Sequence, residues 1–303
     1  MITVCLPTSG AAEGVGAIDG VRVLVWDGKA APPDGIEETE FYLGGYMGGP
    51  LAEQALVRMP KLRVIQLLSA GVEPWLPLVP SGVTLCNGRG VHGGSTAELA
   101  VGGLLSVLRD LPRYHDDQAA HRWSPQSGDD LDGKRVLILG AGDIGRRIAA
   151  ALSVFDAQCT FVARTAREDV HGIDELDGLL PVQDIVVVSL PHTSDTHHLV
   201  DARFLAALPD GAIVVNIARG TIVDQDALFA ELESRRLRAF LDVTDPEPLP
   251  TDHPLWDAPG LVLTPHVGGG TSGWRRRGYR LVREQIERYV RGEDLANVVG
   301  TEY

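Results

Sequence analysis

Three side chains of complementary chemistry each follow a short apolar segment in the second half of the chain. Arg219 follows residues 212–217, Glu247 lies in a proline-rich loop after residues 239–243, and His266 follows residues 261–264. Continuous apolar runs of this length are typical of strands in a buried parallel sheet. The carboxyl ends of such strands face the ligand crevice of an open α/β sheet, so an arginine, a carboxylate and an imidazole are expected to converge there.

This combination suits the reversible reduction of a 2-oxo acid. Imidazole is a natural proton donor near neutral pH, which makes His266 the candidate acid–base. A carboxylate beside it favours the imidazolium and fixes its orientation, the role expected of Glu247. The guanidinium of Arg219 matches a substrate carboxylate and can polarise the C2 carbonyl. Each residue alone also has an ordinary reading, as a structural histidine, a turn glutamate or a surface arginine, so the prediction depends on their occurring together.

A glycine-rich segment, GAGDIG at residues 140–145, stands between a predicted strand and a predicted helix. The first glycine permits a tight turn, the second lets the backbone approach a pyrophosphate, and the third lets the helix pack close to the sheet. The helix N-terminus then meets the phosphates with free N–H groups and its dipole. The alternative is a purely structural strand–turn–helix corner. The predicted contacts to a dinucleotide come from Gly140, Gly142, Asp143, Ile144 and Gly145.

The position that usually selects NAD lacks a carboxylate. Arg164 lies 24 residues after Gly140, at the end of the next predicted strand, and is followed by Thr165 and then Arg167. An acid there would accept hydrogen bonds from a ribose 2′-hydroxyl, whereas arginine and threonine favour a 2′-phosphate. We therefore predict that NADP is preferred and NAD is possible, unless both arginines are merely solvated loop residues. Asp242 is expected near the nicotinamide carboxamide.

The pattern of elements predicts an α/β protein of two domains. A Rossmann-type doubly wound parallel sheet is expected over residues 95–272, as the dinucleotide-binding domain. A discontinuous, flavodoxin-like substrate-binding domain is expected over residues 1–94 and 273–303. The predicted strands of both domains are 2–6, 21–26, 64–68, 83–86, 135–139, 159–163, 184–190, 212–217, 239–243 and 261–264. The predicted helices are 51–59, 96–111, 144–154 and 274–291, the second capped by Ser95 or Thr96 with Glu98 in its first turn.

Composition excludes several classes of function. The 303-residue chain carries a formal net charge of −14, which disfavours nucleic acid as a partner. Its three widely spaced cysteines suggest neither a disulfide framework nor a metal site. No HExxH or GxSxG pattern supports a zinc enzyme or a serine hydrolase. With no evident signal peptide or membrane span, a cytoplasmic location is expected.

Seven segments together resemble the D-2-hydroxyacid dehydrogenases, a family that includes glycerate, glyoxylate/hydroxypyruvate, phosphoglycerate and D-lactate dehydrogenases. These segments occur in order between residues 69 and 271, and their number makes the resemblance specific for the family, though not for a substrate. They are Ser69-Ala70-Gly71-Val72, residues 90–98, GAGDIG, residues 190–197, NIARGTIVDQDAL (216–228), DVTDPEPLPTDHPLW (242–256) and TPHVGGGT (264–271).

The resemblance implies that Arg219, Glu247 and His266 are the catalytic residues. It also implies a hinged cleft and a homodimer formed through the coenzyme domain, in which the segment 113–123 takes part. Backbone N–H groups of Ala70 and Gly71 in the first domain would hold the substrate carboxylate. Arg89 stands at a position where the family varies, and it is expected to face either the substrate or solvent. The further residues expected at the substrate are Ala70, Gly71 and Arg89, and those expected at the cofactor are Pro191, Thr196, Ala218 and Gly268.

Three other classes of protein share this scaffold. Phosphite dehydrogenases keep a similar set of catalytic residues, so the sequence leaves phosphite oxidation open. Formate dehydrogenases replace the catalytic glutamate with glutamine, and Glu247 argues against that activity. Co-repressor-like proteins bind the nucleotide and partner peptides without turnover, but no partner-recognition segment is evident.

Overall fold

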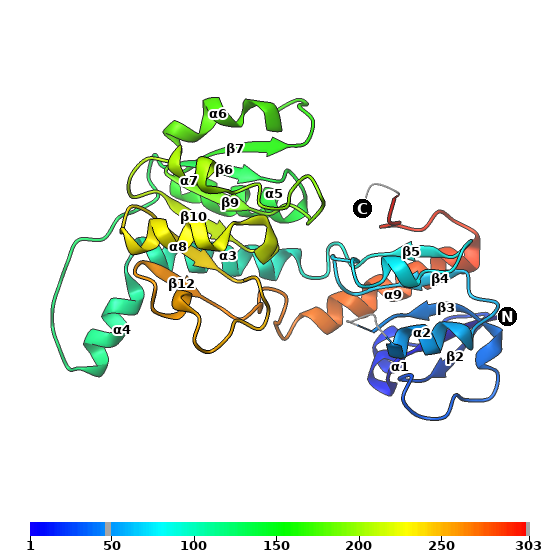
Figure 1. Ribbon diagram of the computed structural model, residues 1–303. Coiled ribbons are helices and arrows are strands. Elements are labelled where there is room, and N and C mark those ends of the chain that lie inside the picture. Colours follow the sequence, from blue (N-terminus) through cyan, green and yellow to red (C-terminus); the bar gives the residue numbers. More distant parts are fainter. Residues whose placement is uncertain (46–49, 301–303) are drawn as a thin grey trace. The chain divides into compact units, whose positions relative to one another are not determined.

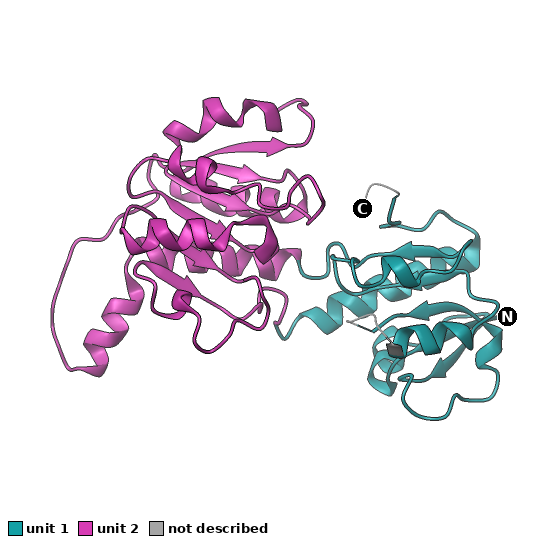
Figure 2. Ribbon diagram, in the orientation of Figure 1, with its two compact units in different colours: residues 1–92, 271–303 teal, residues 93–270 magenta. Residues whose placement is uncertain are grey.

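The computed structural model describes residues 1–45 and 50–300 and divides into two compact units. Unit 1 combines Met1–His92 with the C-terminal residues from Thr271, and unit 2 is Gly93–Gly270 (Figure 2). Each unit is an α/β assembly around a parallel sheet (Figure 1). Within the described residues, no helix is both long and apolar enough to cross a membrane.

Unit 1 contains a parallel sheet with the order β2-β1-β3-β4-β5, which is a flavodoxin-like arrangement. One face packs against α1 and α9, through Val15 and Ile286, and the other packs against α2, through Ala55. The elements are β1 Ile2–Leu6, α1 Ser9–Val15, β2 Val21–Val25, β3 Thr39–Leu43, α2 Pro50–Val57, β4 Val64–Gln66, β5 Thr84–Cys86 and α9 Trp274–Arg291.

Unit 2 contains a parallel sheet with the order β12-β11-β10-β9-β6-β7-β8, which is the Rossmann order extended by one strand. Its strands are β6 Arg135–Leu139, β7 Gln158–Ala163, β8 His171–Gly172, β9 Ile185–Val188, β10 Ile213–Asn216, β11 Arg238–Leu241 and β12 Leu261–Leu263. Its α-helices are α3 Gly93–Leu108, α4 Leu111–Ala119, α5 Asp143–Leu152, α6 Leu176–Leu179, α7 Ala202–Ala206 and α8 Gln225–Glu233.

Alternating strand residues of unit 2 build two separate cores. Ile138 and Phe240 face α3 and α5, while Leu139 and Leu241 face α6, α7 and α8. Burial on both faces explains why these strands read as continuous apolar runs. The helix α3 lies very close to β11, because a Cβ added at Gly103 would come within 2.3 Å of the Phe240 ring.

Several local predictions were wrong. The helix predicted over 96–111 begins at Gly93, so Ser95 and Thr96 are buried within it rather than capping it, and Glu98 lies beyond its first turn. The strand β3 was not predicted, because Thr39 and Glu40 precede only three apolar residues. The helix α1, which Thr8 caps by accepting a hydrogen bond from the Ala11 N–H, was not predicted either.

Candidate active site

The three candidate catalytic residues follow three strands that end in register. Asn216 of β10 pairs with Leu241 of β11, and Leu241 pairs with Leu263 of β12. The loops carrying Arg219, Glu247 and His266 therefore leave the same edge of the unit 2 sheet, as expected from the sequence.

A buried asparagine shapes the loop that presents Arg219. The Asn216 Oδ1 accepts a hydrogen bond from the Ala218 N–H (3.1 Å), and its Nδ2 donates to the Arg219 carbonyl (2.9 Å). Arg219 is half-buried, and its Nη1 donates to the Ala218 carbonyl (2.8 Å). The backbone at Ala218 and Arg219 is thus held from one side chain at the strand end.

The Arg219 loop lies directly against the loop that carries Glu247. A Cβ added at Gly220 would lie 2.0 Å from both the carbonyl carbon and the oxygen of Thr244, and 2.6 Å from the Asp245 nitrogen. Those atoms belong to the backbone, so no side-chain rotation relieves the overlap. Only glycine permits this approach, which couples the position of Arg219 to that of Glu247.

Glu247 and His266 form an ion pair. The Nδ1 of His266 lies 2.8 Å from Oε2 of Glu247, and the other carboxylate oxygen accepts a hydrogen bond from the Thr244 N–H (3.1 Å). Both side chains are 38% exposed, so the pair has access to solvent and to a ligand. Because Nδ1 is engaged, Nε2 is the nitrogen left to exchange a proton with a ligand.

The electrostatics of the site favour the charged forms of this pair. The hydrogen bond to Glu247 and the charge of that carboxylate raise the pKa of His266 above its usual value, while burial and the charge of Arg219 oppose the rise. Burial alone would raise the pKa of Glu247, but His266, the Thr244 N–H and Arg219 outweigh it and leave that pKa below its usual value. The imidazolium form of His266 is therefore favoured.

Asp242 organises the loop that carries His266. Its buried carboxylate accepts hydrogen bonds from the Thr264 hydroxyl (2.6 Å) and from the N–H groups of Val267 and Gly268 (2.9 Å each). Its carbonyl accepts the His266 N–H (2.7 Å), and His266 has a φ of +52°. This left-handed backbone is sparsely populated by non-glycine residues, so Asp242 stabilises a strained loop beside the site.

The glycine-rich loop has the geometry of a pyrophosphate cradle. Gly140 has a φ of +112°, and a Cβ there would lie 2.6 Å from the Ser189 carbonyl oxygen. A Cβ at Gly145 would come within 2.2 Å of the Gly140 carbonyl oxygen, which confirms the close helix–strand packing predicted. Gly142 precedes Asp143 at the start of α5, and no heavy atom lies within 4 Å of a Cβ built on it. This open space at a helix N-terminus fits the phosphates of a dinucleotide.

The three residues predicted to select NADP are exposed beyond the end of β7. Leu139 pairs with Val162, and the Gly140 N–H donates to the Val162 carbonyl, so β6 and β7 end side by side. Arg164, Thr165 and Arg167 follow at this edge. Their placement suits the ribose end of a dinucleotide whose phosphates lie on α5.

The loop after β9 approaches the Arg219 loop. The Thr196 hydroxyl donates to the Pro191 carbonyl (2.8 Å), which closes the loop on itself. The His198 N–H donates to the Thr221 carbonyl (2.9 Å), two residues beyond Arg219. This hydrogen bond joins the loop that contains Pro191 and Thr196 to the segment that follows Arg219.

The residues predicted to hold the substrate belong to unit 1. The Ser69 hydroxyl donates to the Gly71 carbonyl (2.8 Å), and the Gly88 N–H donates to the Ser69 carbonyl (2.7 Å). Hydrogen bonds therefore hold the backbone on both sides of Ala70. Arg89 is exposed, and its Nε donates to Oδ1 of Asn297 (3.2 Å). This contact with Asn297 was not predicted, because the two residues lie far apart in the sequence.

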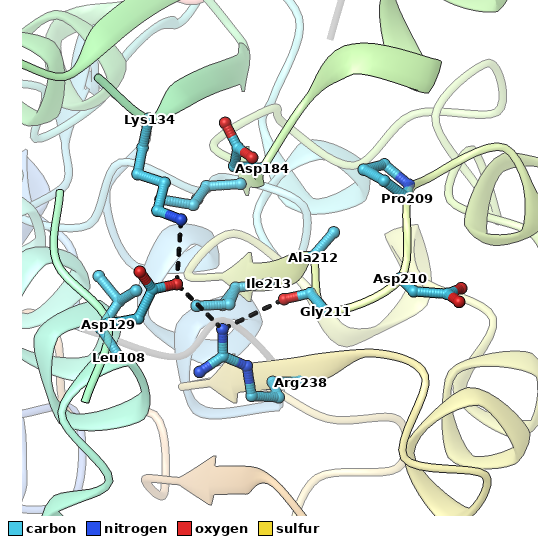
Figure 3. A pocket seen from close by; sticks show the side chains of 11 residues that line it. Leu108, Asp129, Lys134, Asp184, Pro209, Asp210, Gly211, Ala212, Ile213 and Arg238 are labelled. Carbon is cyan, nitrogen blue, oxygen red and sulfur yellow. Dashed lines mark hydrogen bonds and ion pairs between the residues drawn. The ribbon is translucent and has the colours of Figure 1, made fainter. Parts of the chain in front are cut away.

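A separate cavity of about 170 Å³ lies at the opposite edge of the unit 2 sheet. Asp184 and Ala212 directly precede β9 and β10, so the cavity is at the amino ends of the strands (Figure 3). Asp129 pairs there with Lys134 (3.0 Å) and lies 3.7 Å from Arg238. This self-neutralised ion cluster is remote from the candidate catalytic residues. In the described part of the chain, no group of three or more His, Cys, Asp or Glu side chains is arranged to hold a metal ion.

Comparison with known proteins identifies the family to which this fold belongs. Residues 101–268 match the model of the D-isomer specific 2-hydroxyacid dehydrogenase, NAD binding domain. A glyoxylate reductase of Thermofilum pendens is 32% identical over 249 residues, which are 77% of this chain and 74% of that protein. The chain matches only about half the length of the curated D-3-phosphoglycerate dehydrogenases that resemble it.

Solved structures show the same architecture along the whole chain. A D-isomer specific 2-hydroxyacid dehydrogenase from Xanthobacter autotrophicus Py2, in complex with NADPH and MES, has a TM-score of 0.85 and 29% identity, covering 99% of this chain and 98% of that one. An NADPH-dependent glyoxylate/hydroxypyruvate reductase from Sinorhizobium meliloti, in complex with NADP and sulfate, has a TM-score of 0.84 and 26% identity, with the same coverage.

The fold and these comparisons together define a nicotinamide-dependent oxidoreductase that acts on CH–OH donors. The chain belongs to the D-isomer specific 2-hydroxyacid dehydrogenase family.

Proposed function

We propose that this enzyme reduces a small 2-oxo acid to the D-2-hydroxy acid, with His266 as the proton donor, Glu247 as its partner and Arg219 as the substrate-binding cation. The observation that carries the proposal is the 2.8 Å contact between His266 Nδ1 and Glu247 Oε2, on a loop that abuts the Arg219 loop through Gly220. A carboxylate, an imidazole and a guanidinium at one sheet edge are the groups this reaction needs.

The proton path follows from the pairing of His266. A bound nicotinamide supplies the hydride that reaches C2. The Nε2 of His266 donates its proton to the carbonyl oxygen, and the ring remains neutral with its Nδ1–H directed to Glu247. Reduction consumes the imidazolium, so reductive activity is expected below the pKa of His266 and lost above it. Oxidation of the hydroxy acid requires the neutral ring and has the opposite dependence.

Arg219 acts on the substrate before and during this step. Its guanidinium binds the substrate carboxylate and polarises the carbonyl as negative charge develops on the oxygen. Its charge also disfavours the nearby imidazolium, which Glu247 offsets. The Arg219–Glu247–His266 arrangement thus keeps two cations close to one anionic substrate. In unit 1, the N–H groups of Ala70 and Gly71 and the side chain of Arg89 are proposed to complete the contacts with the substrate.

NADP is the proposed preferred cofactor, with NAD as a weaker alternative. Arg164, Thr165 and Arg167 stand at the edge where the ribose of the dinucleotide is expected, and both arginines can bind a 2′-phosphate. The two structural neighbours named above were solved in complex with NADPH and with NADP. Asp242 and Gly268 would line the nicotinamide end. Equal catalytic efficiency with NADH and NADPH would contradict this preference.

The substrate class is tested by following NADPH absorbance with purified enzyme and a panel of acids. We expect oxidation of NADPH by at least one of glyoxylate, hydroxypyruvate, pyruvate, phenylpyruvate and 2-oxoisovalerate, with formation of the D-hydroxy acid. The Thermofilum and Sinorhizobium relatives make glyoxylate the first acid to try. Oxidation of phosphite with NADP⁺, together with no reduction of any acid in the panel, would overturn the proposal. Nucleotide binding without any turnover would overturn it as well.

A homodimer formed through unit 2 is also proposed. Figure 1 shows α4 standing away from the remainder of unit 2, and the segment that follows it carries Trp123, which is 96% exposed. Leu111 at the start of α4 is half exposed. Apolar side chains on a projecting segment are typical of an interface between copies. Light scattering should give the mass of two chains, and Trp123→Ser should shift it toward one; a single-chain mass for the parent would contradict this.

A further inference from the structure

The loop that presents Glu247 needs an anchor outside itself. Residues 245–248 are all exposed, and two of the four are prolines, which offer no backbone N–H for hydrogen bonding. The Thr244 N–H is already used by the Glu247 carboxylate, and the Thr244 hydroxyl donates to the Pro246 carbonyl (2.9 Å). These internal contacts shape the loop without tying it to the sheet or to a helix.

One side chain from α8 binds both backbone groups of Asp245. The Nε2 of Gln225 donates to the Asp245 carbonyl (2.5 Å), and its Oε1 accepts from the Asp245 N–H (2.7 Å). A primary amide carries a donor and an acceptor side by side, so it pairs with the backbone in one orientation. The two bonds therefore restrain both the position and the tilt of the peptide two residues before Glu247.

Hydrogen bonds hold the helix terminus from which Gln225 extends. It is the first residue of α8, and the preceding Asp224 caps this helix by accepting a hydrogen bond from the Ala227 N–H (3.0 Å). The Asp224 N–H donates to the Val200 carbonyl (3.0 Å), and Val200 forms a bridge with the buried Val223. Because this helix N-terminus is held in place, the Gln225 side chain can restrain the loop to which it is hydrogen-bonded.

We propose that Gln225 is a positioning residue for the acid–base pair, holding the loop 244–248 so that the Glu247 carboxylate stays on Nδ1 of His266. The inference rests on the proposed function for its effect on turnover. The claim that Gln225 of α8 holds the Glu247–His266 contact in place applies to the substrate-free enzyme and can be tested without turnover.

Removing the side chain with Gln225→Ala should weaken the contact without adding charge. Loss of two backbone hydrogen bonds is expected to lower kcat for NADPH-dependent glyoxylate reduction by about 10-fold, because fewer molecules hold Glu247 in place. The groups that face His266 are Glu247, Arg219 and Asp242, and only Glu247 stands on the released loop. The pKa of His266 should therefore fall, and the basic limb of the kcat profile should move to lower pH.

A second variant separates geometry from charge. Gln225→Glu keeps the acceptor for the Asp245 N–H but loses the donor and places a carboxylate against the Asp245 carbonyl. Its added negative charge alone would raise the pKa of His266, whereas displacement of Glu247 lowers it. We expect the fall. Ala230→Glu adds the same charge at an exposed position of α8, and Gln158→Ala removes an exposed glutamine, so both serve as controls with parent behaviour.

The deciding measurement is an NMR titration of the His266 imidazole in substrate-free enzyme, with the resonance assigned from its absence in His266→Gln. A lower midpoint in both Gln225 variants than in parent and controls, with NADPH affinity within twofold of the parent, supports the proposal. An unchanged midpoint overturns it, even if kcat falls, because Gln225 would then act on general loop stability alone. A parent that reduces no 2-oxo acid would contradict the proposed function, while the titration would still decide the role of Gln225.

Discussion

Replacing Gly220 by alanine would push the Arg219 and Glu247 loops apart. The added Cβ would lie 2.0 Å from two backbone atoms of Thr244, whereas side-chain carbons approach other heavy atoms no closer than 3.0 Å. The Thr244 backbone must therefore shift by roughly 1 Å, and a misplacement of that size can cost about 100-fold in rate. Because Glu247 follows Thr244 by three residues, we expect Gly220→Ala to lower kcat for 2-oxo acid reduction by about 100-fold.

The assay is steady-state reduction of the best acid of the panel with NADPH, together with thermal unfolding and NADPH affinity. Gly102→Ala is the matched control, because this exposed helical glycine has no heavy atom within 4 Å of an added Cβ. It should keep full activity and gain about 0.5–1 kcal/mol in the free energy of unfolding. A Gly220→Ala enzyme that binds NADPH normally and retains parental kcat would refute the coupling between the two loops.

Three further outcomes follow from the site and the core. His266→Ala should lower kcat by about 10²–10⁴-fold with unchanged NADPH affinity, and retention of kcat in a stopped-flow reduction assay would remove its assigned role. Glu247→Gln should move the basic limb of the reductive pH profile to lower pH, because the pKa of His266 loses its main support; a limb that stays in place would exclude the pairing. Gly103→Ala should destabilise the protein, because the new Cβ would lie 2.3 Å from the Phe240 ring, and a melting temperature equal to that of Gly102→Ala would contradict the packing described.

The pH dependence of stability provides an independent check on the ion pair. The pKa of Glu247 is lowered in the folded protein. The ionised carboxylate therefore contributes to the free energy of unfolding above pH 4.5, and this contribution is lost as the pH falls through the folded pKa. The pKa of His266 is raised, so its contribution is full below the usual value of 6.5 and is lost as pH rises through the folded value. The melting temperatures of the parent and Glu247→Gln should therefore differ most between about pH 4.5 and 6.5.

The sequence predicted six of the seven strands described in unit 2, because burial on both sheet faces leaves continuous apolar runs, but it did not predict β8 or the helices α4, α6, α7 and α8. It failed where tertiary contacts override local propensity. The start of α3 was placed at Thr96 because serine and threonine favour helix caps, yet Gly93 and Gly94 are helical in the structure. Likewise, the glycines of α1 obscured a helix whose Gly14 packs against Tyr279, where a Cβ would come within 2.1 Å of the ring.

The candidate catalytic residues were accessible from the sequence because each follows a strand and the strands run parallel. The sequence did not predict the 2.8 Å contact between His266 Nδ1 and Glu247 Oε2, which are separated by 19 positions in the chain. The two hydrogen bonds between Gln225 and the Asp245 backbone were not predicted either, because a side-chain contact with a distant peptide leaves no periodic pattern in the sequence.

The most direct test of the account is a comparison of the parent enzyme and His266→Ala in NADPH-dependent reduction of glyoxylate and hydroxypyruvate across pH. The account predicts that the parent oxidises NADPH with at least one of these acids, loses activity as pH rises through the pKa of His266, and that the variant loses turnover but binds NADPH as the parent does. A parent that binds NADPH yet reduces neither acid, or a variant with parental turnover at every pH, would contradict it.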